Sequence, residues 1–182
     1  MLIKYTDYIF DYDNTICSIP IDWKTQRLYF KEFAKENFHF SFDNELTVEQ
    51  MEKTLLMKFP LLKEQIYQFR SVLEPKYLNK HLLNKNIFSK LKPTNNNYIV
   101  SNNLTNTVIS GLEYFNLLHF FKKVIGVDFL YSPKPSTKSW LFLKEYYNLS
   151  VSTTVMIGDN PMTDGLYASN IGLSYENVQL IT

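Results

Sequence analysis

Two aspartates two positions apart follow a short apolar run near the N-terminus. The stretch YIFDYDNTIC (Tyr8–Cys17) places Asp11 and Asp13 directly behind Tyr8–Phe10. Carboxylates that lie a few ångströms apart resist simultaneous ionisation. The pair therefore indicates either a solvated turn or a site where something positive lies between the two groups. A calcium loop of the D-x-D type is excluded, because Ile16 stands where such a loop needs glycine.

Three later stretches add polar side chains at comparable positions. VSNN contains Ser101 and Asn102, SPKPS places Lys134 between two prolines, and IGDNPMTD contains Asp159 and Asp164. Prolines fix the backbone on either side of the lysine. Each stretch alone is weak, because most single lysines and serines are simply solvated. Their order, each in the context of a strand end, is much less expected by chance.

Taken in this order, the four stretches resemble the four successive motifs of the haloacid dehalogenase superfamily. The resemblance covers the chain outside a central segment, and DGLYASNIG (164–172) is similar to the family's continuation, a helix followed by a glycine turn. It implies an α/β fold, with a Rossmann-like parallel sheet core and an all-helical cap inserted after the first motif. Asn14 departs from the usual glycine, although asparagine also tolerates tight turns. Because the sequence ends soon after Gly172, one or two edge strands are expected to be missing.

The resemblance also implies catalytic roles. Asp11 would be the nucleophile that attacks phosphorus and forms an aspartyl-phosphate. Asp13 would protonate the leaving oxygen and then activate water, and Lys134 would neutralise the phosphate and the nucleophile.

A magnesium ion is the cofactor that the same resemblance implies. Asp11, the backbone carbonyl of Asp13 and Asp159 would hold it, which are the hard oxygen ligands that Mg²⁺ prefers. Asp164 would orient the water shell of the metal or a neighbouring ligand. Three side chains would donate hydrogen bonds to phosphate oxygens: Thr15, Ser101 and Asn102.

Short apolar runs that each end at a polar or small residue predict the strands that position these groups. The runs are Tyr8–Phe10, Tyr98–Val100, Val124–Val127 and Thr154–Ile157. Helical patterns separate the later runs, one from Val108 to Phe115 with Thr105 or Asn106 as its cap, and one from Trp140 to Tyr147. Alternation of strands and helices favours a parallel α/β sheet, which binds ligands at the carboxyl ends of its strands.

The segment of residues 19–86 shows only helical periodicity and no strand. Its apolar stripes are Phe30 to Phe38, Val48 to Phe59 and Leu62 to Leu73, followed by a shorter helix from Lys76 to about Asn84. A capping box, Thr47 with Gln50, opens the second stripe, and Pro75 ends the third. We therefore expect a core of residues 1–18 and 87–182 and a helical cap of residues 19–86. The cap residues Lys24, Arg27 and Arg70 are expected to be solvated.

Composition limits the possible partners. The 182 residues include 19 basic and 18 acidic side chains, and a net charge of +1 gives no electrostatic case for nucleic acid or an anionic membrane. No apolar stretch is long enough to span a bilayer. The single cysteine, Cys17, cannot form an internal disulfide and is expected to be buried. We expect a cytoplasmic protein, monomeric or homodimeric, that acts on a small phosphorylated metabolite.

The predicted function is hydrolysis of a small phosphomonoester by a magnesium-dependent phosphatase. A phosphomutase of the same superfamily and a non-catalytic phosphate-ligand-binding protein on the same scaffold remain alternatives. Carbon–halogen hydrolysis is disfavoured, because Asp13 supplies an acid that phosphoryl transfer needs and dehalogenation does not.

Overall fold

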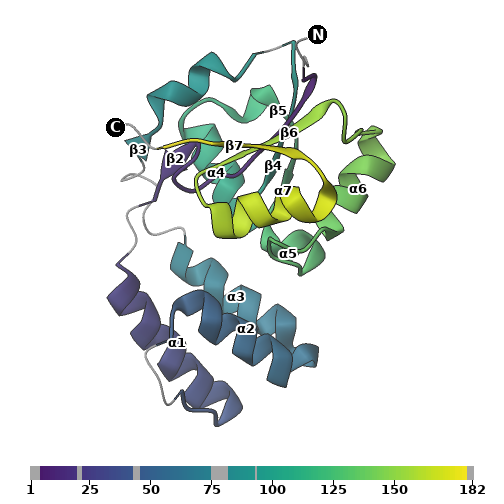
Figure 1. The fold of residues 1–182 in the computed structure, drawn as a ribbon. Coiled ribbons are helices and arrows are strands. Elements are labelled where there is room, and N and C mark those ends of the chain that lie inside the picture. Colours follow the sequence, from purple (N-terminus) through teal and green to yellow (C-terminus); the bar gives the residue numbers. More distant parts are fainter. Residues whose placement is uncertain (1–4, 20–21, 43–45, 75–81, 93, 180–182) are drawn as a thin grey trace. The chain divides into compact units, whose positions relative to one another are not determined.

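The chain forms two compact units (Figure 1). One unit combines Met1–Ile19 with Leu78–Thr182, and the other is Pro20–Tyr77. The predicted insert, residues 19–86, is longer at both ends than this second unit. The computed structural model describes residues 5–19, 22–42, 46–74, 82–92 and 94–179.

A five-stranded parallel sheet forms the centre of the first unit, in the order β5-β4-β1-β6-β7. The strands are β1 (Asp7–Phe10), β4 (Asn96–Val100), β5 (Phe121–Ile125), β6 (Thr154–Gly158) and β7 (Ser174–Asn177). β1 lies between β4 and β6 and is parallel to both. This is the order of a doubly wound sheet, so the predicted Rossmann-like α/β core is confirmed. β7 forms an edge strand after Gly172.

Helices cover the sheet and explain why the central strands β1 and β6 are buried along most of their length. They are α4 (Thr105–Tyr114), α5 (Val127–Leu130), α6 (Lys138–Tyr147) and α7 (Leu166–Ile171), with short turns η3 (Lys85–Ser89), η4 (Leu118–Phe120) and η5 (Pro161–Gly165). Ile9 of β1 packs in one cluster with Leu143 of α6 and Tyr167 of α7. The next residue, Phe10, points to the opposite face and is also fully buried. Both faces of the central strand are therefore covered.

The strand predicted at Val124–Val127 ends earlier than expected. β5 stops at Ile125, and Val127 begins α5. The backbone N–H of Val127 donates to the carbonyl of Asn103 at 3.0 Å. This bond to another loop turns the chain away from the sheet, which apolar character alone does not reveal.

The N-terminus of α4 is capped by a residue of α5, which is distant in the sequence. The carboxylate of Asp128 accepts the backbone N–H and the hydroxyl of Thr105, at 2.7 and 2.8 Å. Leu104 occupies the N-cap position and provides no side-chain hydrogen bond, so the prediction of Thr105 or Asn106 as the cap is wrong. A tertiary contact replaces the local cap.

A small antiparallel sheet joins β2 (Cys17–Ser18) to β3 (Leu82–Leu83). The prediction that the insert contains no strand is therefore wrong. Most of the short helix predicted for Lys76–Asn84 lies outside the described residues, and the part that is described is β3. The amide of Asn84 then donates to the carbonyl of Thr15 at 2.9 Å, which links this segment to the loop after β1.

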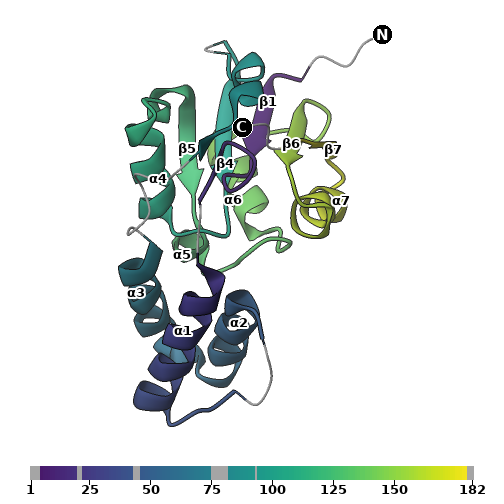
Figure 2. The same ribbon diagram turned by 90° about the vertical axis from the view of Figure 1, so that its left-hand side faces the viewer.

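The second unit is helical, as predicted (Figure 2). Its elements are α1 (Trp23–Phe38), α2 (Val48–Lys58), η1 (Pro60–Leu62) and α3 (Lys63–Leu73). The predicted capping box of Thr47 and Gln50 forms, with bonds in both directions. Aromatic side chains from α1 and α3 hold the core, and the rings of Phe33 and Phe69 stack with centroids 4.0 Å apart. These contacts give the unit an apolar core of its own.

Arg70 is paired inside this unit rather than solvated, so that prediction is wrong. Its guanidinium contacts Glu52 at 2.9 Å and Glu74 at 2.6 Å. Burial raises the pKa of Glu52, although the charge of Arg70 opposes the shift. The position of Arg70 on α3 reveals Glu74 as an i,i+4 partner but does not reveal Glu52 on α2.

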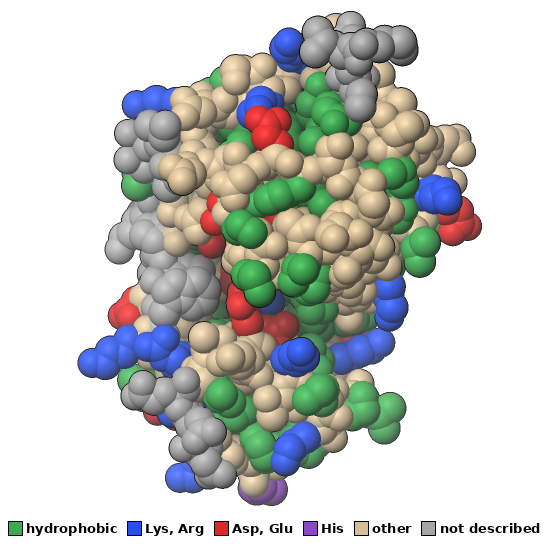
Figure 3. Space-filling view, viewed as in Figure 1, with side chains coloured by type: hydrophobic (Ala, Val, Ile, Leu, Met, Phe, Trp, Pro, Cys, Tyr) green, Lys and Arg blue, Asp and Glu red, His purple; other side chains and the backbone are tan. Residues whose placement is uncertain are grey.

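Among the described residues, no helix has the length and apolar character needed to cross a membrane. Basic and acidic side chains are both visible on the face drawn in Figure 3. This agrees with the nearly balanced charge of the sequence.

Candidate active site

Polar side chains gather at the carboxyl edge of the parallel sheet. Asp11 follows β1, Ser101 follows β4 and Asp159 follows β6. Because β1 is paired in register with both neighbours up to its last residue, the three strands end side by side. This is the edge at which open α/β sheets bind ligands.

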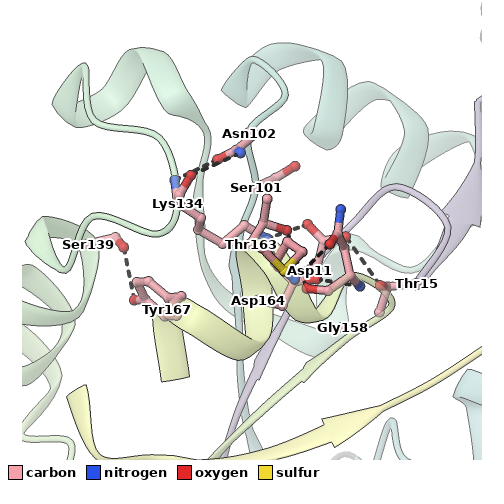
Figure 4. A network of polar contacts seen from close by, with 12 residues as sticks. Asp11, Thr15, Ser101, Asn102, Lys134, Ser139, Gly158, Thr163, Asp164 and Tyr167 are labelled. Atoms are coloured by element: carbon pink, nitrogen blue, oxygen red, sulfur yellow. Dashed lines mark hydrogen bonds and ion pairs between the residues drawn. The ribbon is translucent and has the colours of Figure 1, made fainter. Parts of the chain in front are cut away.

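A buried lysine lies among these carboxylates (Figure 4). The Nζ of Lys134 is 2.5 Å from Oδ1 of Asp11 and 2.6 Å from Oδ1 of Asp164. All three side chains are buried, with Asp164 only 1% exposed. Burial disfavours the ammonium form, but the two carboxylates outweigh it and raise the pKa of Lys134. The lysine therefore supplies a fixed positive charge at this edge.

Asn102 holds the backbone of Lys134. Its Oδ1 accepts the backbone N–H of Lys134 at 2.7 Å, and its Nδ2 donates to the carbonyl of Lys134 at 3.4 Å. We predicted a phosphate donor at Asn102. In the structure its amide contacts the loop that carries the lysine and fixes the backbone of Lys134.

Three carboxylates form a cluster that fits a hard cation. One oxygen from each of Asp11, Asp159 and Asp164 can be chosen so that all three lie within 4.8 Å of one another. Lys134 contacts only two of the three, and one positive charge does not balance three carboxylates. An all-oxygen donor set with excess negative charge matches the preference of Mg²⁺.

The pKa values of the cluster reflect this crowding. Burial raises the pKa of Asp11 to about 7, against the charge of Lys134 and with the help of the charge of Asp164. Burial and the charge of Asp164 also raise the pKa of Asp159. An additional cation here would favour the ionised carboxylates.

The two predicted hydroxyl donors lie at the same edge. The hydroxyl of Thr15 donates to Oδ2 of Asp11 at 3.2 Å. Ser101 is buried, and its Oγ accepts the backbone N–H of Asn103 at 3.1 Å. Because this bond uses an acceptor site, the serine O–H proton does not take part in it.

Asp13 lies in the tight loop after β1 and is half-buried. Its Oδ1 accepts the backbone N–H of Ile19 at 3.1 Å. Asn14 adopts a positive φ of 57°, the left-handed conformation that asparagine tolerates. The cluster of three carboxylates contains Asp164 and not the side chain of Asp13.

Gly158 allows Asp164 to approach the end of β6. A Cβ added to this glycine would lie 2.2 Å from Oδ2 of Asp164. In the sequence, Gly158 follows the apolar run Thr154–Ile157 and begins the motif GDNPMTD, but no structural role was predicted for it or for Asn84, which holds the loop of Thr15. The position of Gly158 in this motif could have indicated a role, whereas Asn84 lies in no motif that would have indicated one.

We expect Gly158→Ala to displace Asp164. The overlap should lower the rate of any reaction that uses these carboxylates, by about tenfold or more, and the stability, by roughly 1–3 kcal/mol, as overpacking does. Thermal unfolding and steady-state kinetics would measure the two effects. Adding Asp164→Ala should recover part of the stability but not the activity. An unchanged melting temperature in Gly158→Ala would contradict the close approach.

A model of the haloacid dehalogenase-like hydrolase family matches residues 8–178 of this chain. No curated protein sequence matches it significantly. Many solved structures are similar in fold. One from Bacteroides fragilis, named a haloacid dehalogenase-like hydrolase, has a TM-score of 0.65 at 20% identity and covers 98% of this chain and 90% of its own.

Two further solved structures are similar over most of their length. One from Lactobacillus plantarum is named a phosphoglycolate phosphatase, with a TM-score of 0.61, 17% identity and coverage of 94% of this chain and 85% of its own. The other is a haloacid dehalogenase-type hydrolase of Bacillus subtilis bound to magnesium, with a TM-score of 0.58, 20% identity and coverage of 94% and 87%. At these identities the structures establish the fold, and the family model covers nearly the whole chain. The chain belongs to the haloacid dehalogenase-like hydrolases.

Proposed function

We propose that this hydrolase is a magnesium-dependent phosphatase acting on a small phosphorylated metabolite through an aspartyl-phosphate. The observation that supports it most is the contact of buried Lys134 with Asp11 and Asp164, beside Asp159. A carboxylate nucleophile, a fixed cation and oxygen ligands for a metal lie together at the ligand-binding edge of the sheet. The structural neighbour named a phosphoglycolate phosphatase supports the same class of reaction.

In the first half of the reaction, a carboxylate oxygen of Asp11 attacks phosphorus. A bond forms between this oxygen and phosphorus while the bond from phosphorus to the ester oxygen breaks. Asp13 gives its proton to the departing oxygen, which leaves as an alcohol. Lys134 and Thr15 already contact the two oxygens of Asp11 and so orient the nucleophile.

In the second half, water replaces the enzyme on phosphorus. Asp13, now ionised, takes a proton from water, whose oxygen attacks the aspartyl-phosphate. The bond from phosphorus to Asp11 breaks, and inorganic phosphate leaves. The same residue thus acts as acid and then as base.

The residues at this edge fit the predicted magnesium site. Asp11, Asp159 and the backbone carbonyl of Asp13 would hold the ion, and Asp164 would orient its water shell. When bound, Mg²⁺ would offset the negative charge of the carboxylates and of the phosphate. Ser101, Thr15 and Asn102 would then donate hydrogen bonds to phosphate oxygens. Thr15 would give up its bond to Asp11 for this, and the Nδ2 of Asn102 its bond to the carbonyl of Lys134.

Metal removal is the experiment that tests this function. Purified protein, assayed on a broad panel of phosphate esters, should release phosphate with Mg²⁺ and lose activity by at least about 100-fold after chelation. Readdition of Mg²⁺ should restore the rate. An Asp11→Asn protein purified in parallel controls for contaminating phosphatases. Full activity in chelator would contradict the metal assignment, and no phosphate release from any ester with Mg²⁺ would contradict the phosphatase assignment.

A further inference from the structure

Two side chains of the edge strand β7 hold the loop that carries Asp159. The hydroxyl of Tyr175 donates to the carbonyl oxygen of Gly158 at 3.1 Å. The amide of Asn177 donates to the carbonyl oxygen of Asp159 at 3.3 Å and to the hydroxyl oxygen of Tyr175 at 3.0 Å. The hydroxyl proton and both amide protons are thus all directed into this small network.

The network begins where the sheet ends. Gly158 is in register with Asn177, and it is the last residue of β6. Beyond Gly158 the strand ladder no longer supports the backbone, and the side chain of Asn177 reaches the next carbonyl, that of Asp159. Side-chain hydrogen bonds therefore hold the backbone at Asp159, beyond the last residue of β6.

Tyr175 also contacts the other end of the same segment. A Cβ added to Gly165 would lie 3.3 and 3.5 Å from two carbon atoms of the Tyr175 ring, so the ring packs directly against this glycine. Gly165 follows Asp164, and Gly158 precedes Asp159. One side chain therefore spans the segment that carries both carboxylates.

Neither side chain is fully buried, although the ring of Tyr175 packs against the apolar core of the sheet. Asn177 is exposed and Tyr175 is only partly buried. Loss of their polar groups should leave the apolar core of the sheet intact. Their polar groups bond to each other and to the backbone of Gly158 and Asp159.

We propose that Tyr175 and Asn177 are positioning residues that set the affinity of the site for its divalent cation. They act through the backbone of Gly158 and Asp159 and hold the Asp159 carboxylate beside Asp11 and Asp164. The inference rests on the proposed magnesium site. Groups outside the ligand shell that orient the ligands typically affect metal affinity by 10- to 100-fold. Neither residue is proposed to contact the substrate.

Binding of Mg²⁺, measured by calorimetry without substrate, provides the test. Tyr175→Phe keeps the ring against Gly165 and removes the hydroxyl, so we expect the Mg²⁺ dissociation constant to rise by about tenfold. Asn177→Ala should have a similar effect, and the double variant should weaken binding by less than the product of the two effects, because the residues share one network. At saturating Mg²⁺, KM for the ester should stay unchanged.

Tyr5→Phe is the matched control. The hydroxyl of Tyr5 donates to Oγ of Ser174, at the other end of β7 and away from the Asp159 segment. This variant also removes one phenolic hydrogen bond to β7, yet it should bind Mg²⁺ as the wild type does. Thermal unfolding of each variant reports whether the fold is kept.

The results separate this inference from the function on which it rests. If the wild type binds Mg²⁺ and both Tyr175→Phe and Asn177→Ala bind it equally well, the positioning role is wrong and the phosphatase proposal stands. If Tyr5→Phe weakens binding as much as Tyr175→Phe, the effect belongs to the strand as a whole and the positioning role is again wrong. If the wild type itself binds no Mg²⁺, the metal site fails, and this inference fails with it.

Discussion

Asp11→Asn is expected to abolish phosphatase turnover. The amide oxygen is a far weaker nucleophile than a carboxylate oxygen, so formation of the phosphoryl-enzyme should fail. We expect kcat to fall by at least about 10⁴-fold, or roughly 5.4 kcal/mol in activation free energy. Asparagine has nearly the same shape as aspartate, and its carbonyl oxygen can still accept one bond from Lys134 or Thr15. Lys134 also keeps its contact with Asp164, so the fold should be retained.

Rapid-quench labelling with a phosphate ester that carries ³²P tests this result directly. The wild type should show acid-stable label on the protein during turnover, and Asp11→Asn should show none. Circular dichroism and thermal unfolding control for loss of the fold. Label on Asp11→Asn at the level of the wild type would show that another residue is the nucleophile.

Asp13→Asn should impair the reaction by an amount that depends on the leaving group. Asparagine can still accept the N–H of Ile19 through its Oδ1, so the loop geometry should persist. The proton donor is lost, and esters of basic alcohols should slow by about 10²- to 10⁴-fold. An ester such as 4-nitrophenyl phosphate, whose acidic phenol departs without protonation, should be affected less in this first step.

The second step should then limit the rate of this variant. Without Asp13 as the base, water attacks slowly, and the aspartyl-phosphate should accumulate when 4-nitrophenyl phosphate is the substrate. A burst of nitrophenol and trapped label on the protein would be the measurements. Equal slowing of every ester, together with no trapped phosphoryl-enzyme, would exclude the acid–base role of Asp13.

The strands that end at the site were predictable because their signal is local. Uninterrupted apolar runs bounded by polar residues identified three of them, and β1, β4 and β6 lie where the runs predicted. In a parallel sheet the carboxyl ends share one edge, so Asp11, Ser101 and Asp159 were expected to lie near one another. The proposed role of Lys134 came from the order of the motifs and not from periodicity.

Several features depended on partners far away in the sequence, and these were missed. Asp128 caps α4 from 23 positions away, Leu82–Leu83 pairs with a strand more than sixty residues earlier, and Arg70 pairs with Glu52 on another helix. Single-residue propensities carry no information about such pairs. The short strand in the insert and the cap of α4 therefore differ from the sequence-based expectation.

By itself, the sequence determined the parallel α/β core, the helical insert and the chemical types of the residues at the strand ends. Only the tertiary structure decided the contacts among those residues: Lys134 between Asp11 and Asp164, and Asn102 on the lysine backbone. Apolar periodicity specifies which face of an element is buried, but side-chain contacts over 30 to 123 positions depend on packing. The same holds for Tyr175, because its hydroxyl can donate to the carbonyl oxygen of Gly158, at the end of the neighbouring strand, only when the sheet has formed.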